Sequence, residues 1–329
     1  MKKLINDVDT VLTDALDGLA QAHADILTVA PAHRFVRRRT LTPGKVALIS
    51  GGGSGHEPLH AGFVGHGMLD AACPGQVFTS PTPDQMLAAA ESVDTGAGVL
   101  FLVKNYAGDT MNFQMAADLL DRPNDTVLIN DDVAVENSTY TVGRRGVAGT
   151  VIVERMVGAA AERGLSLAAL KTLGDAVTQR TASMGVALTS CTVPAAGSPT
   201  FTLADHEMEM GVGIHGEPGR RRVPLAAARD IAAELTGSVL SSLQLARGQE
   251  VILLVNGFGG TPLMELYVMV NEATTRLAGA GITVVRHLTG NYVTSLEMAG
   301  CSITVSAVDA DAIALWDAPV HTAALRWGM

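Results

Sequence analysis

The feature that most constrains the fold of this 329-residue chain is a regular change between short apolar runs and helical segments. Three runs, Lys45–Ser50, Gly98–Lys104 and Thr126–Ile129, are almost continuously apolar, which is typical of strands buried on both faces of a parallel sheet. Helices are expected between them at Pro83–Ser92 and Thr110–Leu120. Strands that alternate with helices in this way favour βαβ units with right-handed crossovers.

The pattern changes in the second half of the chain. The expected strands Gly185–Cys191 and Glu209–His215 alternate more between apolar and polar residues, as strands of an antiparallel or mixed sheet do. We therefore predict two α/β domains, residues 1–182 with a mainly parallel sheet and residues 183–329 with a mixed sheet. The other expected elements are helices at Leu4–Ala20, Gly146–Arg163, Ser166–Ala182 and Pro262–Ala278 and strands at Glu250–Asn256, Thr283–Arg286 and Ser302–Val308.

Composition and charge exclude several classes of function. Hydrophobic residues make up 47% of the chain and charged residues 17%, so a large core is available. Aromatic residues are only 4% and the net charge is −10, which makes nucleic acids and anionic membranes poor partners. The basic run Arg34–Arg39 is expected to be a solvated face. Because no signal peptide and no apolar run of about 18 residues is visible, we expect a cytoplasmic protein outside the membrane.

A glycine-rich segment, Gly51–Pro58 (GGGSGHEP), directly follows the first expected strand. Glycines allow backbone N–H groups to approach a ligand closely, and the carboxyl ends of strands are where open α/β sheets bind ligands. The segment is neither a Walker A loop nor a dinucleotide fingerprint, because the residues those motifs require are missing. A tight turn without a ligand is the alternative, but His56 at the mouth of the loop favours acid–base chemistry.

Two further segments place reactive side chains at expected strand ends. Asp109 in Lys104–Asp109 (KNYAGD) either caps the helix that follows or acts as a base toward a hydroxyl group. His215 in Gly211–Gly219 (GVGIHGEPG) is either an ordinary loop residue or a reactive imidazole between glycines that leave it open. We expect His56 and His215, one from each domain, to face one cleft.

No metal site is predicted. Asp131 and Asp132 resemble a divalent-metal pair, but a solvated loop or a helix start is the commoner setting for such residues. The acidic residues and histidine at positions 205–209 point in different directions along a strand. The thiols of Cys73, Cys191 and Cys301 are isolated, so neither zinc nor a disulfide framework is indicated.

Several long segments closely resemble the substrate-binding subunits of dihydroxyacetone kinases, and the resemblance runs essentially from end to end. It implies that His215 bonds through a ring nitrogen to the carbonyl carbon of a short keto-sugar and forms a hemiaminal. An imidazole nitrogen has no second proton to lose, so the addition stops before an imine. Glycerol, which has no carbonyl, is excluded. The segments that carry the resemblance are GGGSGHEP (51–58), CPGQVFTSPTPDQM (73–86), KNYAGD (104–109), CTVPAAG (191–197), GVGIHGEPG (211–219) and LWDAPVHTAALRWG (315–328).

The resemblance also implies roles for the other site residues. His56 and Asp109 polarise the substrate and deprotonate the hydroxyl group that is phosphorylated. The residues implied to bind the substrate are Gly53, Ser54, Gly55, His56, Lys104 and Asp109. Holding the nucleophile in place is a large part of catalysis in phosphoryl transfer.

The nucleotide is expected elsewhere. This chain stops soon after the last resembling segment, so we expect no cofactor in it and a separate helical partner subunit that carries ADP and magnesium. A phosphotransferase-system phosphocarrier would then rephosphorylate the ADP, and the chain is expected to be a homodimer. Three alternatives stay open: a kinase subunit for a related ketose such as erythrulose, a co-regulator that senses dihydroxyacetone without turnover, and a plain binding protein.

Overall fold

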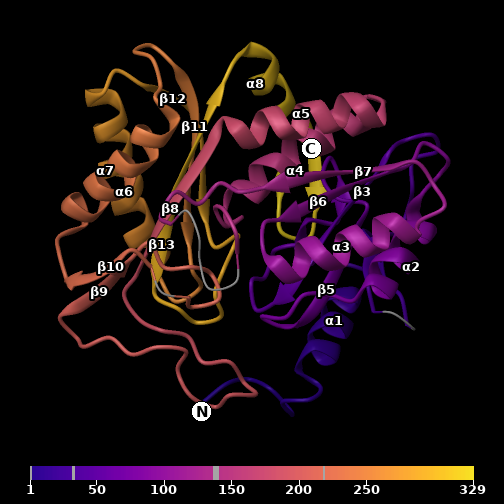
Figure 1. Ribbon diagram of the computed structural model, residues 1–329, viewed down its shortest axis with the longest axis horizontal. Coiled ribbons are helices and arrows are strands. Elements are labelled where there is room, and N and C mark those ends of the chain that lie inside the picture. The colour runs from indigo at the N-terminus through magenta and orange to yellow at the C-terminus, as the bar shows by residue number, and fades with distance from the viewer. Residues whose placement is uncertain (1, 32–33, 136–140, 218) are drawn as a thin grey trace. The chain divides into compact units, whose positions relative to one another are not determined.

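The computed structural model describes residues 2–31, 34–135, 141–217 and 219–329 (Figure 1). The chain forms two compact units that interleave along the sequence. The first unit comprises Met1–Leu128, Val153–Ala176 and Ala314–Met329, and the second comprises Ile129–Ile152 and Val177–Ile313. A single domain boundary between residues 182 and 183 stays a prediction.

The first unit contains a six-stranded sheet in the order β1–β2–β5–β3–β6–β7. Its central strands β5, β3 and β6 run parallel, while β1 and β2 join one edge in antiparallel pairing. The expected α/β fold with a mainly parallel first sheet is confirmed. The strands are β1 (Leu27–Val29), β2 (Val36–Arg38), β3 (Ala47–Ser54), β5 (Ala71–Val77), β6 (Val99–Lys104) and β7 (Asn124–Ile129).

Two helices, α2 (Pro83–Val93) and α3 (Ala107–Leu119), pack against this sheet and against each other. Every residue of β3 and of β6 is buried, as their continuous apolar sequences predict. Phe101 of β6 and Phe113 of α3 meet edge to face with ring centroids 5.6 Å apart. Burial of each such large side chain contributes roughly 1.5–3 kcal/mol, so this contact helps to hold the middle of α3 against the middle of β6.

The N-terminal helix is shorter than expected. Helix α1 is Val11–Ala22, whereas the apolar stripe predicts a start at Leu4. Leu4 is fully exposed, and the carboxylate of Asp7 accepts a hydrogen bond from the backbone N–H of Asp9 at 2.8 Å. An Asp side chain that bonds its own backbone in this way competes with helix formation. The helix therefore begins only after this turn.

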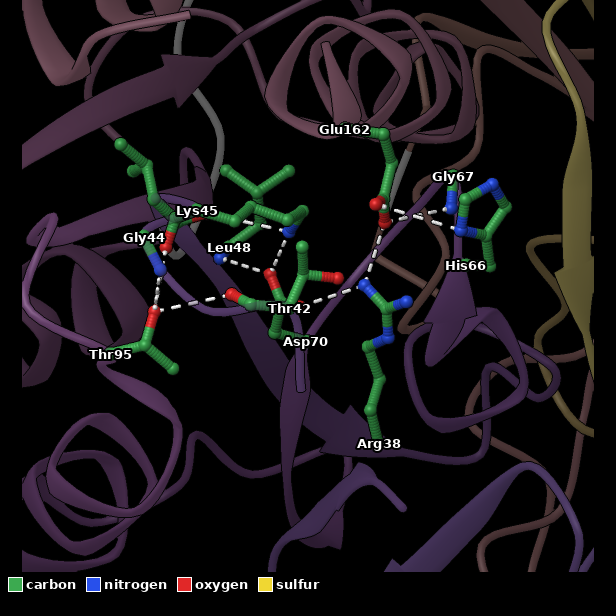
Figure 2. A network of polar contacts seen from close by, with 11 residues as sticks. Arg38, Thr42, Gly44, Lys45, Leu48, His66, Gly67, Asp70, Thr95 and Glu162 are labelled. Carbon is green, nitrogen blue, oxygen red and sulfur yellow. Dashed lines mark hydrogen bonds and ion pairs between the residues drawn. The ribbon is translucent and has the colours of Figure 1, made fainter. Parts of the chain in front are cut away.

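A buried network of charges ties the first sheet together (Figure 2). Asp70 accepts hydrogen bonds from Lys45, from Arg38 at 3.0 Å and from the backbone N–H of Leu48 at 2.8 Å. Arg38 also contacts Glu162 at 2.6 Å. Burial raises the pKa of Glu162, but Arg38 and Lys45 outweigh burial and hold it below its usual range. The expectation of a solvated face is thus wrong for Arg38, which is only 7% exposed.

The second unit contains a mixed sheet in the order β10–β9–β8–β13–β11–β12. Only β11 and β12 pair in parallel, and the other neighbours are antiparallel. Helices α6 (Ala228–Leu243) and α7 (Leu263–Gly279) contact each other and supply much of the core against this sheet (Figure 1). The predicted mixed sheet is confirmed. Its strands are β8 (Thr181–Ala187), β9 (Glu207–Met210), β10 (Arg221–Pro224), β11 (Glu250–Gly257), β12 (Thr283–Gly290) and β13 (Gly300–Val308).

The remaining elements lie outside these two sheets. Within the described residues, no helix is sufficiently long and apolar to span a bilayer. Helices α4, α5 and α8 each contribute residues to both units. These elements are α4 (Gly149–Glu162), α5 (Leu167–Gln179), α8 (Ala310–Trp316), the 3-10 helix η1 (Ala61–Phe63) and the small sheet of β4 (Gly65–His66), β14 (Val320–Thr322) and β15 (Arg326–Trp327).

Candidate active site

The glycine run is part of a strand and not a loop, which corrects the prediction from the sequence. Strand β3 continues through Gly51, Gly52 and Gly53 to Ser54, fully buried. A Cβ atom on Gly51 would lie 2.6 Å from the carbonyl oxygen of Cys73, and one on Gly53 would lie 2.6 Å from the backbone nitrogen of Thr79. The glycines therefore permit close approach of β3 to the neighbouring backbone, which no other residue allows.

Gly52 has a different neighbour. A Cβ atom there would lie 2.3 Å from Nζ of Lys104, the last residue of β6. The Lys104 side chain is 1% exposed and lies along the glycine strand, where it also donates to the carbonyl oxygen of Gly51 at 3.3 Å. The missing side chain of Gly52 is thus the space that the ammonium group occupies.

Asp109 meets Lys104 at the start of α3. Lys104 Nζ lies 3.4 Å from Oδ2 of Asp109, and the hydroxyl of Ser80 donates to Oδ1 at 2.5 Å. Asp109 is the third residue of α3, whose N-cap position is Tyr106, and no side chain caps the helix. The capping alternative for Asp109 is therefore wrong. Both carboxylate oxygens are held by neighbouring side chains, which fixes the orientation of a candidate base.

Two further residues, His60 and Glu154, form a hydrogen-bonded line with Lys104, and the sequence did not predict them as site residues. His60 Nε2 lies 3.0 Å from Lys104 Nζ, and His60 Nδ1 lies 2.7 Å from Oε1 of Glu154 on α4. Burial, followed by the charges of Lys104 and His56, lowers the pKa of His60 well below its usual value. Burial raises the pKa of Glu154 to about 8, against the opposing effect of Lys104. The only sequence signal was a histidine four residues after His56.

His56 follows β3 and is buried at 1% exposure. Its ring stacks on Phe78, with centroids 5.0 Å apart and planes at 12°. The next residue, Glu57, accepts hydrogen bonds from the backbone N–H of Gly55 at 2.9 and 3.1 Å, and burial raises its pKa. The Ser54 hydroxyl donates to the carbonyl oxygen of Gly75 at 2.7 Å. The segment is thus held rigid by contacts within the first unit.

His215 lies in the second unit, in a turn five residues beyond the end of β9, and not at a strand end as expected. Its side chain is 15% exposed. Its Nδ1 lies 3.2 Å from Oε1 of Glu217, and its backbone N–H donates to Oε2 of the same carboxylate at 3.0 Å. When Nδ1 donates to the carboxylate, the lone pair of the neutral ring is on Nε2. Glu217 thus selects which ring nitrogen can act as a nucleophile.

Buried charges hold Glu217 in its ionised form. Burial raises the pKa of Glu217, but His215 and Arg145 outweigh it and bring the value to about 2. A Cβ atom on Gly213 would overlap the Glu217 carboxylate, so this glycine makes room for it. Arg145 also donates to Asp132 at 2.9 Å and to the carbonyl oxygen of Gly211 at 2.8 Å. The turn that carries His215 is therefore anchored on a buried arginine.

The acidic pair that resembled a metal site has a structural role. Asp131 accepts hydrogen bonds from the backbone N–H groups of Val147 and Gly149 at 2.8 and 2.7 Å, at the start of α4. Burial raises the pKa of Asp132 to about 6, against the attraction of Arg145. Both carboxylates are buried, so the solvated-loop interpretation is wrong, while a helix start describes Asp131. No three His, Cys, Asp or Glu side chains of the described residues are grouped so that they could hold a metal ion.

The structure brings Lys104 and Asp109 together beside the glycine strand, with His56 on the segment that follows it. His215 stands with Glu217 in the other unit. The expectation that His56 and His215 face one cleft stays a prediction, as do the substrate contacts of Gly53, Ser54 and Gly55.

Comparison with known proteins identifies the family. The Dak1 domain matches residues 17–324. The chain belongs to the Dak1 family. It is 50% identical to the dihydroxyacetone-binding subunit DhaK of the PEP-dependent dihydroxyacetone kinase of Escherichia coli, with both chains covered completely. It is 51% identical to the corresponding subunit of a PTS-dependent dihydroxyacetone kinase of Listeria innocua, over 93% of this chain and 94% of the relative.

Solved structures of this Dak1 family share the fold. The dihydroxyacetone kinase operon co-activator DhaQ superposes with a TM-score of 0.91 at 33% identity, over 95% of this chain and 98% of that one. The dihydroxyacetone kinase of C. freundii in complex with AMP-PNP and Mg²⁺ gives a TM-score of 0.90 at 31% identity, over 99% of this chain and 61% of that one. The close relatives are thus substrate-binding subunits of multi-subunit kinases, and the family also includes a co-activator.

Proposed function

We propose that this chain is the dihydroxyacetone-binding subunit of a phosphoenolpyruvate-dependent dihydroxyacetone kinase, and that it holds the keto-sugar on His215 as a hemiaminal. The pairing of His215 with the ionised Glu217 carboxylate carries the proposal, because it leaves the lone pair of the ring on Nε2. Full-length identity of 50% to the E. coli subunit supports the choice of substrate.

The covalent step follows from this tautomer. Nε2 of His215 attacks the carbonyl carbon of the substrate, and the electron pair of the C=O bond moves to oxygen. Positive charge develops on the ring, where the Glu217 carboxylate beside Nδ1 stabilises it. The ring gives up its Nδ1 proton, and the alkoxide takes up one proton and becomes a hydroxyl group. The product is a neutral hemiaminal with one new C–N bond.

The second step belongs to Asp109. Its carboxylate, oriented by Ser80 and Lys104, accepts the proton of the substrate hydroxyl as that oxygen attacks the phosphoryl group. His56 polarises the same substrate. ADP and magnesium are carried by a helical partner subunit, and a phosphotransferase-system phosphocarrier rephosphorylates that ADP. No metal or nucleotide is assigned to this chain.

The first test is intact-protein mass spectrometry after incubation with dihydroxyacetone. The expected result is a mass gain of one dihydroxyacetone that disappears on dialysis, is absent with glycerol and is abolished by His215→Ala. His206→Ala is the matched control, because His206 is an exposed histidine of the same unit. A gain that survives His215→Ala contradicts the assignment of the nucleophile.

A second candidate function is a co-regulator that binds dihydroxyacetone without turnover. The TM-score of 0.91 to the DhaQ co-activator supports this second candidate. The two candidates differ in Asp109, which only the kinase needs. If the reconstituted complex phosphorylates dihydroxyacetone and Asp109→Asn stops this while the adduct still forms, the chain is a kinase subunit; adduct formation without any phosphorylation supports the co-regulator. Erythrulose is tested in parallel, because a D-erythrulose kinase of Mycolicibacterium smegmatis is 39% identical over the full chain.

A further inference from the structure

We propose that His60 and Glu154 are positioning residues for the phosphoryl-transfer step: Glu154 fixes the tautomer of His60, and His60 fixes the Lys104 ammonium against the Asp109 carboxylate. This inference rests on the proposed function, in which Asp109 is the base. It concerns a buried line of four polar side chains in the first unit, drawn from three separate segments of the chain.

The direction of each hydrogen bond in this line follows from the first one. An ammonium group has only donors, so Lys104 Nζ donates to His60 Nε2 across 3.0 Å. Because burial and the neighbouring positive charge keep His60 neutral, its single ring hydrogen is then on Nδ1. That nitrogen lies 2.7 Å from Oε1 of Glu154, which must accept.

Ser50 of β3 completes the support of the ring. Its hydroxyl donates to the carbonyl oxygen of Leu102 at 2.6 Å, so its oxygen is an acceptor 2.9 Å from His60 Nδ1. His60 is therefore clamped on one edge by two acceptors and on the other by an ammonium. The charged or titratable groups that act on the ring are Lys104 from β6, Glu154 from α4 and His56 from the segment after β3.

The ammonium of Lys104 has three hydrogens, and the structure provides three acceptors. They are His60 Nε2, the carbonyl oxygen of Gly51 at 3.3 Å and Asp109 Oδ2 at 3.4 Å. The first two acceptors bind two of the ammonium hydrogens, so the third hydrogen is left to point at the Asp109 carboxylate. An error of about 1 Å in the position of such a group can cost about 100-fold in rate. We therefore expect the residues that hold the Lys104 ammonium in place to affect turnover.

Variants at two positions of helix α4 test the proposal. Glu154→Gln keeps an oxygen that accepts from His60 Nδ1, whereas Glu154→Leu removes the acceptor and keeps a side chain of similar size. The control is Thr150→Val, a buried position one turn earlier on α4 whose hydroxyl has no hydrogen-bond partner among the described residues. Each variant is combined with the remaining subunits of the E. coli PEP-dependent kinase, and adduct formation and turnover are measured separately.

We expect Glu154→Leu to lower kcat by ~10-fold or more while the dihydroxyacetone adduct on His215 forms as in the wild type. Glu154→Gln should stay within about threefold of the wild type, and Thr150→Val should not differ from it. A fully active Glu154→Leu, or a Glu154→Gln as impaired as Glu154→Leu, overturns the inference. A wild-type chain that forms neither adduct nor product contradicts the proposed function itself.

The tautomer of His60 provides a readout that needs neither turnover nor a stable Glu154→Leu protein. In the wild-type chain labelled with ¹⁵N-histidine, the His60 ring, identified by its loss in His60→Gln, should show a protonated Nδ1 and an unprotonated Nε2. A protonated Nε2 overturns the inference whatever the kinetics show.

Discussion

At the scale of single residues, each of the two candidate reactive groups is oriented by neighbouring side chains, a role that the sequence did not predict for those neighbours. Glu217 holds Nδ1 of His215, and Lys104 with Ser80 holds Asp109. In both cases a short, directional contact decides which atom can react. The reactive histidine and aspartate could be proposed from motifs, but their orientation could not.

Replacing Glu217 tests this control at His215. Glu217→Gln removes the charge that stabilises the ring as it becomes positive, and its amide can present N–H to Nδ1 and so favour the wrong tautomer. We expect adduct formation with dihydroxyacetone to slow by at least ~10-fold while the fold is kept. The measurement is the rate of mass gain at fixed substrate concentration, with Glu207→Gln, a partly exposed acid of the same unit, as control. Equal rates for Glu217→Gln and wild type would show that Glu217 has no such role.

At the scale of elements, strand β3 shows how a glycine run can be read wrongly. Its apolar start correctly predicts a buried strand, but the glycines that follow predict, wrongly, a loop that ends the strand. They instead continue the strand, because their neighbours are the backbone near Cys73 and Thr79 and the ammonium of Lys104. Glycine in a strand often marks such a close approach.

Two glycines near the end of β3, Gly52 and Gly53, should respond differently to a methyl group. Gly53→Ala places Cβ against the backbone of Phe78 and Thr79, at 2.6–2.7 Å, where nothing flexible can give way. We expect a loss of roughly 1–3 kcal/mol in the free energy of unfolding. Gly52→Ala meets the far end of the long Lys104 side chain and not backbone, so the ammonium can shift and we expect a smaller loss of stability than for Gly53→Ala, together with reduced turnover.

Thermal and urea unfolding, with turnover measured on the same preparations, distinguish the two outcomes. Gly18→Ala on α1, where an added Cβ meets nothing within 4 Å, is the control and should not destabilise. If Gly52→Ala loses as much stability as Gly53→Ala, the proposed space for the Lys104 ammonium is not what constrains this position.

At the scale of the whole molecule, each unit is an α/β layer structure stabilised by its own apolar core, and each also buries charge. The Asp70 network in the first unit and the Asp132–Arg145 pair in the second are nearly inaccessible to solvent. Such pairs are costly to break, because removal of one partner leaves a buried charge alone. Buried carboxyl groups also make the stability of the fold depend on pH.

Glu154 should dominate one part of that dependence. Burial raises its pKa from 4.5 to about 8, so the folded state binds a proton more tightly than the unfolded state does. The resulting stabilisation is complete below pH 4.5 and is lost as the pH rises to about 8. The difference in Tm between Glu154→Gln and wild type should therefore grow in favour of the variant from pH 5 to pH 8, by the equivalent of ~1 kcal/mol or more, and level off above that.

Differential scanning calorimetry across this pH range checks the prediction, and Thr150→Val should run parallel to wild type throughout. A constant difference between Glu154→Gln and wild type would mean that Glu154 titrates normally in the folded protein.

The fold class, most strands and helices, and the candidate residues His56, Asp109 and His215 could be predicted from the sequence, because apolar periodicity and short motifs are local signals. Tertiary contacts were needed to show that Gly51–Gly53 belong to a strand, that Asp109 is held by Ser80 and Lys104, and that Glu217 directs His215. They also revealed the line from Glu154 through His60 to Lys104, whose members are up to 94 positions apart. Most of those features depend on contacts between residues far apart in the sequence, and the near neighbours His215 and Glu217 meet through the conformation of their turn, which composition and spacing do not encode.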